Sequence, residues 1–277
     1  SLIKLIDIKI KNLLSFNLMP IFISKSIGQT PNELINDYKK THPDAKKVSF
    51  AGRLDPMAFG KMMLLVNDEC KLQPRYIGLD KIYEFEIVYG FKTDTYDILG
   101  LVNSFTNIFN VQSLYSIETL DLNTYIKKFV QTYPPYSSIV VNKKPLWEWS
   151  KLGKIDTITI PSKLVEIYSL ETIENTHTFD NYNDLYTDII HSISTLSEEN
   201  KPKFRFNDIV DSWKNTFETL NLRRSQHLSQ FGPYKPLIKK YRATVSSGTY
   251  IRSLAHQIGK DVGCGAIAMN IKRVDFI

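Results

Sequence analysis

The chain has 277 residues and carries 35 Lys and Arg against 29 Asp and Glu, which gives a net charge of +6 and an isoelectric point of about 9.0. This length suffices for one large domain or for a domain with an insertion. The two cysteines, Cys70 and Cys264, exclude a disulfide framework and a zinc ribbon and indicate a reducing compartment. The charge suits a polyanion such as RNA, but it also fits a merely basic protein.

The N-terminal residues 1–18 are apolar only in patches, because Lys4, Asp7, Lys9 and Lys11 interrupt them. No apolar run in the chain approaches the roughly 18 to 20 residues that a transmembrane helix needs. No small-residue cleavage site follows this segment. We therefore interpret residues 1–18 as an N-terminal extension, expect no membrane association, and place the start of the folded domain near Met19.

Local patterns predict both helices and strands. Thr30 to Glu33 form a capping box with proline at the first helical position, so a helix is expected to begin there. Residues 82–89 alternate as a half-buried strand does, with Glu84 and Glu86 on the face opposite to Tyr83, Phe85, Ile87 and Tyr89. After Gly248, apolar residues at helical spacing predict an amphipathic helix: Ile251, Leu254, Ala255 and Ile258. The mixture predicts an α+β fold.

Two loops far apart in sequence carry opposite charges. Asp55 lies between Gly52 and Gly60 and directly before a proline, which favours a turn over a helix or strand interior. Such a loop leaves its carboxylate available for chemistry. The second loop, residues 248–252, leads into the predicted helix and ends at Arg252.

The segment from Gly52 to Gly60, followed by an apolar strand, resembles the TruB-type pseudouridine synthases, a family that isomerises a uridine in the T arm of transfer RNA. Further stretches follow in the family's order: residues 81–83 leading into 89–100, 134–138 running to 146–149, 250–254, 263–266 and 271–273. Any one of these motifs is weak, but the ordered set is strong. The resemblance implies a mixed, mainly antiparallel sheet with flanking helices.

The resemblance also implies the catalytic residues. Asp55 matches the family's catalytic aspartate, and Arg252 matches the arginine that we expect to keep this carboxylate charged and oriented, because burial alone would raise its pKa. Tyr83 matches the active-site tyrosine, on which a flipped uracil could stack. Ile271 matches an apolar residue that lines the pocket, although a strand isoleucine fits a core position equally well.

Five further residues are candidates for substrate binding. Phe50 stands where many bacterial relatives carry a histidine, and Arg53 precedes the catalytic motif. Tyr136, Lys143 and Lys144 belong to the segment that resembles the family's RNA-clamping thumb, together with Trp147 and Trp149. We expect one of these two tryptophans to be core.

Residues 174–240 do not fit the family pattern and are interpreted as an insertion between the two parts of the catalytic domain, 19–173 and 241–277. Residues 171–200 hold seven acidic side chains and no basic one, whereas residues 201–240 hold nine basic and three acidic. The basic half could contact RNA, or the segment could be a solvated helical pair with an aromatic core. Its basic and aromatic residues are Arg205, Arg223, Arg224, Lys235, Lys239 and Lys240 among Phe204, Phe206, Trp213, Phe231 and Tyr234. Because the sequence stops four residues after Arg273, we expect no C-terminal PUA domain and ask whether the insertion replaces it.

The resemblance implies an RNA pseudouridine synthase whose substrate is transfer RNA and whose target is the uridine at position 55. Two alternatives stay open: an RsuA- or RluA-like enzyme acting on ribosomal RNA, suggested by the Gly-Arg-Leu-Asp sequence, and a non-catalytic RNA-binding or folding protein. The family pattern leaves two mechanisms open, attack of the aspartate on uracil C6 or action at the ribose C1′.

We expect no cofactor and no metal ion, since the chain has no Gly-rich phosphate loop and its five histidines show no ligand spacing with the cysteines. We further expect a monomer in a reducing interior. The cytoplasm is the first expectation, with the nucleus, an organelle or a viral factory as alternatives.

Overall fold

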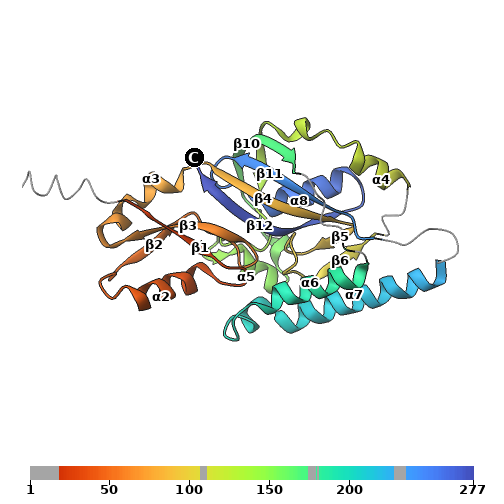
Figure 1. Cartoon of the computed structure of the whole chain (residues 1–277), viewed down its shortest axis with the longest axis horizontal. Coiled ribbons are helices and arrows are strands. Elements are labelled where there is room, and N and C mark those ends of the chain that lie inside the picture. Colours follow the sequence, from red (N-terminus) through yellow and green to blue (C-terminus); the bar gives the residue numbers. More distant parts are fainter. Residues whose placement is uncertain (1–18, 107–110, 174–178, 180, 228–234) are drawn as a thin grey trace, which may run out of the picture.

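The computed structural model describes residues 19–106, 111–173, 179, 181–227 and 235–277. An eight-stranded sheet forms its centre, with strands in the order β1-β3-β12-β4-β11-β10-β7 and β2 paired with β3 (Figure 1). These strands span Ile21–Lys25 (β1), Val48–Ala51 (β2), Phe59–Val66 (β3), Lys81–Tyr89 (β4), Lys128–Thr132 (β7), Ser162–Thr172 (β10), Ile238–Val245 (β11) and Ala266–Phe276 (β12).

Neighbouring strands of this sheet are antiparallel except for β3 and β12, which are parallel. Two short hairpins complete the described strands: Phe91–Thr93 (β5) with Val102–Phe105 (β6), and Val140–Val141 (β8) with Lys144–Pro145 (β9). The helices are Pro31–Thr41 (α2), Gln73–Ile77 (α3), Val111–Glu118 (α4), Leu146–Lys151 (α5), Tyr182–Ser194 (α6), Phe206–His227 (α7) and Ile251–Asp261 (α8). The predicted α+β class is confirmed.

The predicted helix starts are correct. Thr30 accepts a hydrogen bond from the backbone N–H of Glu33, and the Glu33 carboxylate accepts one from the backbone N–H of Thr30, as a capping box requires. Helix α8 begins at Ile251 and buries Ile251, Leu254, Ala255 and Ile258. The capping box therefore located α2, and the apolar periodicity located α8.

Strand β4 differs from the predicted half-buried strand. Tyr83, Phe85, Ile87 and Tyr89 do share one face, which packs in the same core as helix α8. The opposite face is also covered, because Val88 joins a second core together with side chains of α6 and α7, and Glu86 is only 8% exposed. The prediction of a solvated second face was wrong, since it took no account of helices that follow a hundred residues later.

Residues 174–240 supply that second layer. Helices α6 and α7 lie side by side along the sheet (Figure 1), and Trp213 and Phe217 are buried with Phe91 in the core beneath them. The end of this segment belongs to the sheet, because Lys239 and Lys240 lie in β11 and pair with Ile87 and Glu86 of β4. The N-terminal extension, Phe231, Tyr234 and the side chains of Arg223 and Arg224 lie outside the described residues.

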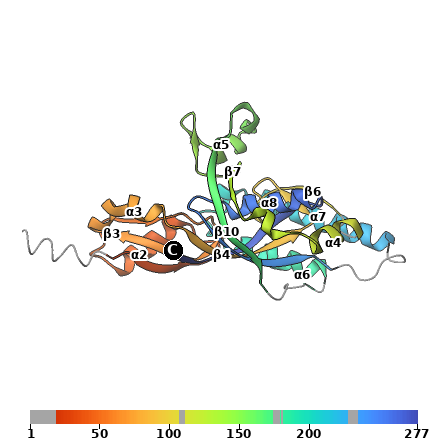
Figure 2. The ribbon, with the colours of Figure 1, turned by 90° about the horizontal axis from the view of Figure 1, so that it is seen from above.

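One part of the chain projects from this body. Figure 2 shows helix α5 and the ends of β7 and β10 standing out from the layers of the sheet and its helices. This projection is the segment that resembles the thumb, and we call residues 133–161 the thumb below. Helix α5 carries Trp147, which is 41% exposed, whereas the Trp149 indole donates a hydrogen bond to the Val141 carbonyl (3.0 Å).

Candidate active site

The two oppositely charged loops meet in the folded chain. Arg252 Nε donates a hydrogen bond to Asp55 Oδ2 over 2.7 Å, although 197 residues separate them. The Arg252 side chain is 3% exposed and the Asp55 side chain 31% exposed. Among the described residues, the second carboxylate oxygen, Oδ1, has no hydrogen-bond partner. A buried guanidinium thus holds one oxygen of a carboxylate whose other oxygen is free to react.

Backbone carbonyls fix the Arg252 guanidinium. One terminal nitrogen donates to the Thr95 carbonyl (2.5 Å) and the other to the Tyr136 carbonyl (3.1 Å). Because the five N–H groups of a guanidinium lie in one plane, these two bonds and the bond to Asp55 set its orientation. Thr95 follows strand β5 and Tyr136 lies in the thumb, so Arg252 joins three segments of the chain.

A second carboxylate lies beside the pair. Asp97 Oδ2 is 3.7 Å from Arg252 Nε, and its Oδ1 accepts hydrogen bonds from the Thr95 hydroxyl (2.7 Å) and the Leu99 backbone N–H (2.9 Å). Burial raises the pKa of Asp97 to about 6, although Arg252 and the Thr95 hydroxyl lower it. This group therefore titrates close to neutral pH.

Aromatic rings border Arg252. Its guanidinium carbon lies 5.7 Å from the centre of the Tyr250 ring, which meets the Tyr133 ring edge-on at 5.7 Å. The Gln131 side chain holds the Tyr250 backbone by two hydrogen bonds, one from the Tyr250 N–H (2.8 Å) and one to its carbonyl (3.2 Å). Burial, with a smaller contribution from Asp55, raises the pKa of the Tyr250 hydroxyl to about 12. This hydroxyl is therefore protonated at neutral pH.

Two buried cations hold the backbone of the Asp55 loop. Lys25 donates to the carbonyls of Pro56 (3.1 Å) and Ala58, and Arg273 donates to the Gly52 carbonyl (3.1 Å). Burial lowers the pKa of Lys25 to about 7, while nearby Asp55 raises it. The contacts that these two groups make with the loop are all to its backbone carbonyls.

Gly60 shows how closely this loop packs against β12. Its φ of +99° is disfavoured for other residues, and a Cβ there would lie 2.4 Å from the Arg273 carbonyl oxygen. Only glycine fits at this position.

Tyr83 and Ile271 lie in the main core of the sheet. Both are buried, at 7% and 6% exposure, in one cluster with Leu54 and Ile251, the neighbours in sequence of Asp55 and Arg252. The cluster thus connects them to the residues that flank the ion pair. The role of Tyr83 towards a substrate stays a prediction.

Phe50 and Arg53 lie at the surface beside the Asp55 loop. The exposed Arg53 side chain places its guanidinium carbon 5.9 Å from the centre of the half-buried Phe50 ring. The Phe50 carbonyl accepts a hydrogen bond from the Gln73 side chain (2.8 Å), which fixes the backbone of β2. Arg53 is open to solvent, whereas the Phe50 ring packs partly against the core.

The thumb residues divide between the site and the projection. Tyr136 contacts Arg252 through its carbonyl and therefore belongs to the site. Lys143 is exposed with a left-handed backbone (φ 66°), and Lys144 pairs with Glu148 (2.7 Å) in the turn and helix of the projection. Neither lysine contacts Asp55 or Arg252 among the described residues, so any role in binding RNA would be exerted from the thumb.

Sequence patterns assigned no role to four of the site residues, namely Asp97, Tyr250, Lys25 and Arg273. Asp97, Tyr250 and Arg273 lie within stretches that carried the family resemblance, so their position in those motifs was an available signal. Lys25 shows only as a charged residue at the end of an apolar strand. An inward-pointing lysine there indicates buried acceptors, because a fully buried lysine is rare unless it is paired.

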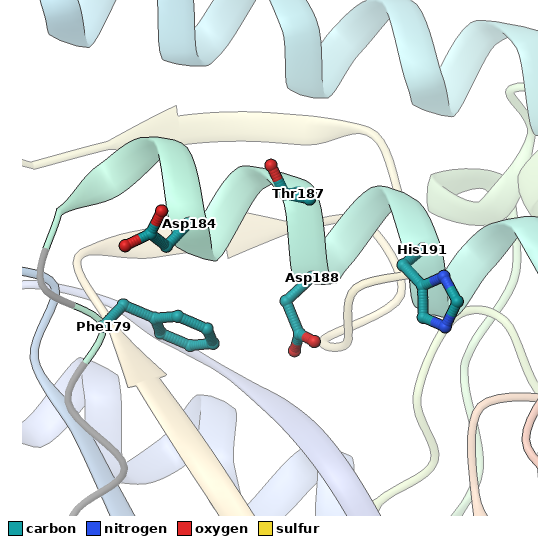
Figure 3. Close-up of a pocket in the computed structure, with 5 residues that line it drawn as sticks. All are labelled: Phe179, Asp184, Thr187, Asp188 and His191. Carbon is teal, nitrogen blue, oxygen red and sulfur yellow. The ribbon is translucent and has the colours of Figure 1, made fainter.

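Two surface hollows lie elsewhere. One of about 330 Å³ lies along α6 and is lined by Phe179, Asp184, Thr187, Asp188 and His191 (Figure 3). The other, of about 510 Å³, is lined by the loop after β1, by α2 and by the segment that follows α6, with Glu33, Asp37 and Glu199 on its wall. Neither hollow is lined by Asp55 or Arg252. Their acidic walls disfavour phosphate groups.

Within the described ranges, no three His, Cys, Asp or Glu side chains are grouped as a metal site would need. Among the same residues, no helix has the length and the apolar character of a membrane span.

The site consists of a partly accessible carboxylate oriented by a buried arginine, next to residues of the apolar core. Residues 39–192 match the family described as TruB family pseudouridylate synthase (N terminal domain). This match covers more than half of the chain. The protein belongs to the TruB family of pseudouridylate synthases.

Individual relatives agree with this family assignment. The chain is 24% identical over 255 residues to tRNA pseudouridine synthase B of Aquifex aeolicus (92% of this chain, 67% of the relative). It is 27% identical over 249 residues to tRNA pseudouridine synthase 4 of Saccharomyces cerevisiae (82% and 60%). Against tRNA pseudouridine synthase B of Francisella tularensis it is 28% identical over 268 residues (95% and 66%). The chain spans about 60 to 67% of the length of these relatives.

Among solved structures, the chain resembles one described as the crystal structure of a Cbf5-Nop10-Gar1 complex. The TM-score is 0.51 at 15% identity, over 94% of this chain and 49% of the other. At this identity the likeness concerns the fold alone, and it agrees with the α+β assignment.

Proposed function

We propose that this protein converts uridine to pseudouridine in RNA, with Asp55 as the catalytic residue, and that its substrate is transfer RNA modified at position 55 of the T arm. The observation that carries the proposal is the Asp55–Arg252 pair at 2.7 Å in a member of the TruB family. The names of the relatives, tRNA pseudouridine synthase B and 4, support transfer RNA as the substrate.

The reaction needs a nucleophile that can also leave. The uracil must be detached from the ribose at N1, turned, and rejoined at C5, with no net oxidation or reduction. A carboxylate can form and release a covalent intermediate. Because Arg252 binds only Oδ2 of Asp55, the free Oδ1 is the atom that we assign to attack, at either uracil C6 or the ribose C1′.

The target base must leave its stack to reach Asp55. Unstacking costs a few kcal/mol and is least costly in a loop nucleotide. We propose that the opened RNA is held by the half-buried Phe50 and the exposed Arg53 beside the Asp55 loop and by Tyr136, Lys143 and Lys144 on the thumb. We propose that Tyr83 and Ile271, which share a core cluster with the neighbours of Asp55 and Arg252, line the pocket in which the uracil rests.

Tritium release tests this proposal. Transfer RNA labelled with tritium at uridine C5 loses the label only when a new bond forms at C5. We expect the purified protein to release tritium and Asp55→Asn, which keeps the shape and the hydrogen bond from Arg252, to release none. Release from ribosomal RNA but not transfer RNA would assign the substrate to the RsuA- or RluA-like alternative. Binding to RNA without any release would identify a non-catalytic RNA-binding protein.

A further inference from the structure

The helices of the inserted segment are fastened to the loop that orients Arg252. We call residues 93–102 the bracing loop, because the Thr95 carbonyl in it accepts a hydrogen bond from Arg252. Three side chains from residues 205–213 hold this loop at its start, middle and end. Arg205 pairs with Asp94, the Trp213 indole donates to the Ile98 carbonyl (2.9 Å), and the Ser212 hydroxyl accepts from the Val102 N–H (3.0 Å).

Arg205 makes the closest of these contacts to the site. Its two terminal nitrogens donate to the two oxygens of Asp94 at 2.7 and 3.2 Å, a forked ion pair in which both side chains are mostly buried, at 16% and 20% exposure. Asp94 in turn accepts a hydrogen bond from the Leu101 N–H (2.9 Å), which closes the bracing loop on itself. The pair therefore sets the shape of the loop.

The same guanidinium covers a second segment that orients Arg252. The Arg205 guanidinium carbon lies 4.3 Å from the centre of the Tyr136 ring, within the range of a cation–π contact. The Tyr136 carbonyl is the other backbone acceptor of Arg252. Arg205 thus touches both segments whose carbonyls fix Arg252, without contacting Arg252 itself.

The backbone at Arg205 is unusual. It adopts a left-handed conformation (φ 57°, ψ 37°) at the junction between a short 3-10 helix, Pro202–Phe204, and helix α7. This conformation is uncommon for a residue with a side chain, and it persists where the surrounding contacts over-determine it. Here the Asp94 and Tyr136 contacts fix the side chain that this turn presents.

We propose that Arg205 is a positioning residue for pseudouridine formation, holding Asp94 and Tyr136 so that the Thr95 and Tyr136 carbonyls keep Arg252 directed at Asp55. The proposal rests on the function proposed above. It assigns the inserted helices a part in catalysis, rather than the replacement of an RNA-binding domain. Misplacement of a catalytic group by about 1 Å lowers rates by up to about 100-fold.

The test is a comparison of kcat and KM in the tritium-release assay. Arg205→Ala should lower kcat by about 10- to 100-fold and leave KM within about threefold. Arg205→Lys should recover only part of kcat, because an ammonium cannot form the forked pair. The exchange variant, Arg205→Asp with Asp94→Arg, should recover more than Arg205→Asp alone. Asn221→Ala is the control, because it breaks a 3.0 Å contact between α7 and α6 that does not reach the bracing loop.

Several outcomes would refute the proposal. A raised KM with unchanged kcat in Arg205→Ala would make Arg205 an RNA contact, and unchanged kcat and KM would remove it from the reaction. If Arg205→Ala does not fold, Arg205→Lys and Trp213→Phe replace it, and normal kcat in both folded variants would overturn the proposal. Wild-type protein measured in parallel separates the two proposals, because absence of release from wild type refutes the proposed function and this proposal with it.

Discussion

Replacing Arg252 by lysine separates the charge of this residue from its geometry. Lysine keeps a positive charge near Asp55, but its ammonium cannot reach Asp55 and the Thr95 and Tyr136 carbonyls in one plane. Losing the oriented, charge-assisted bond to Asp55 costs about 2 to 3 kcal/mol. If that bond serves the transition state, kcat falls about 30- to 150-fold. The two carbonyls, left without their donors, should lower the free energy of unfolding by about 1 to 3 kcal/mol each.

Single-turnover tritium release measures the rate, and urea unfolding measures the stability of the same samples. Arg252→Met, which removes the charge as well, should be slower and less stable than Arg252→Lys. Arg242→Lys is the matched control, because Arg242 lies half-exposed on β11 with only a 3.8 Å contact to Glu84. A single-turnover rate for Arg252→Lys within about threefold of wild type would show that orientation by the guanidinium is unimportant and would refute the reasoning.

Two other predictions concern Asp97 and Gly60. Because burial raises the pKa of Asp97 to about 6, the stability that this group contributes is present at low pH and is lost as the pH rises through about 6. Below that pH Asp97 is neutral and no longer pairs with Arg252, so the activity should fall on the acidic side with an apparent pKa of about 6. Asp97→Asn should abolish this limb in a pH–rate profile, and a limb that persists would assign the titration to another group. Gly60→Ala should lower the free energy of unfolding by more than about 2 kcal/mol, because its Cβ would lie 2.4 Å from a backbone oxygen. Gly153→Ala, at φ +63° with nothing within 4 Å, controls for backbone strain alone in the same urea titration, and equal losses in the two variants would contradict the packing argument.

Local sequence patterns predicted the elements whose structure is decided locally. The capping box at Thr30 and the apolar stripe of α8 depend on residues within a few positions of one another, and both are present in the structure. The prediction that the second face of β4 is solvated was wrong, because the burial of that face is decided by distant parts of the chain. Its cover comes from α6 and α7, and no periodicity in residues 82–89 records which helices arrive from elsewhere in the chain.

In the candidate site, too, the sequence predicted some features and gave no sign of those that depend on distant parts of the chain. The family motifs named Asp55 and Arg252, and the need to pair a partly buried carboxylate explained why they should meet. The contacts that orient Arg252 are backbone carbonyls, which any residue type provides, so the sequence carries no mark of them. Arg205 is likewise one basic residue among nine in its region. Only the fold places it 2.7 Å from Asp94, 111 residues earlier in the chain.

The position of β12 in the sheet has a consequence for how the protein is made. This strand comprises residues 266–276, yet it lies between β3 and β4. Within the described part of the chain, the N-terminal strands β1, β2 and β3 therefore join the remainder of the sheet only through β12, which is synthesised after the other described strands. On the ribosome, the Asp55 loop and Arg252 can be formed separately, but the sheet that keeps them together must wait for β12. Because such long-range pairing is slow, the incomplete sheet exposes unpaired strand edges during synthesis, and chaperones that cover such edges should raise the yield of folded protein.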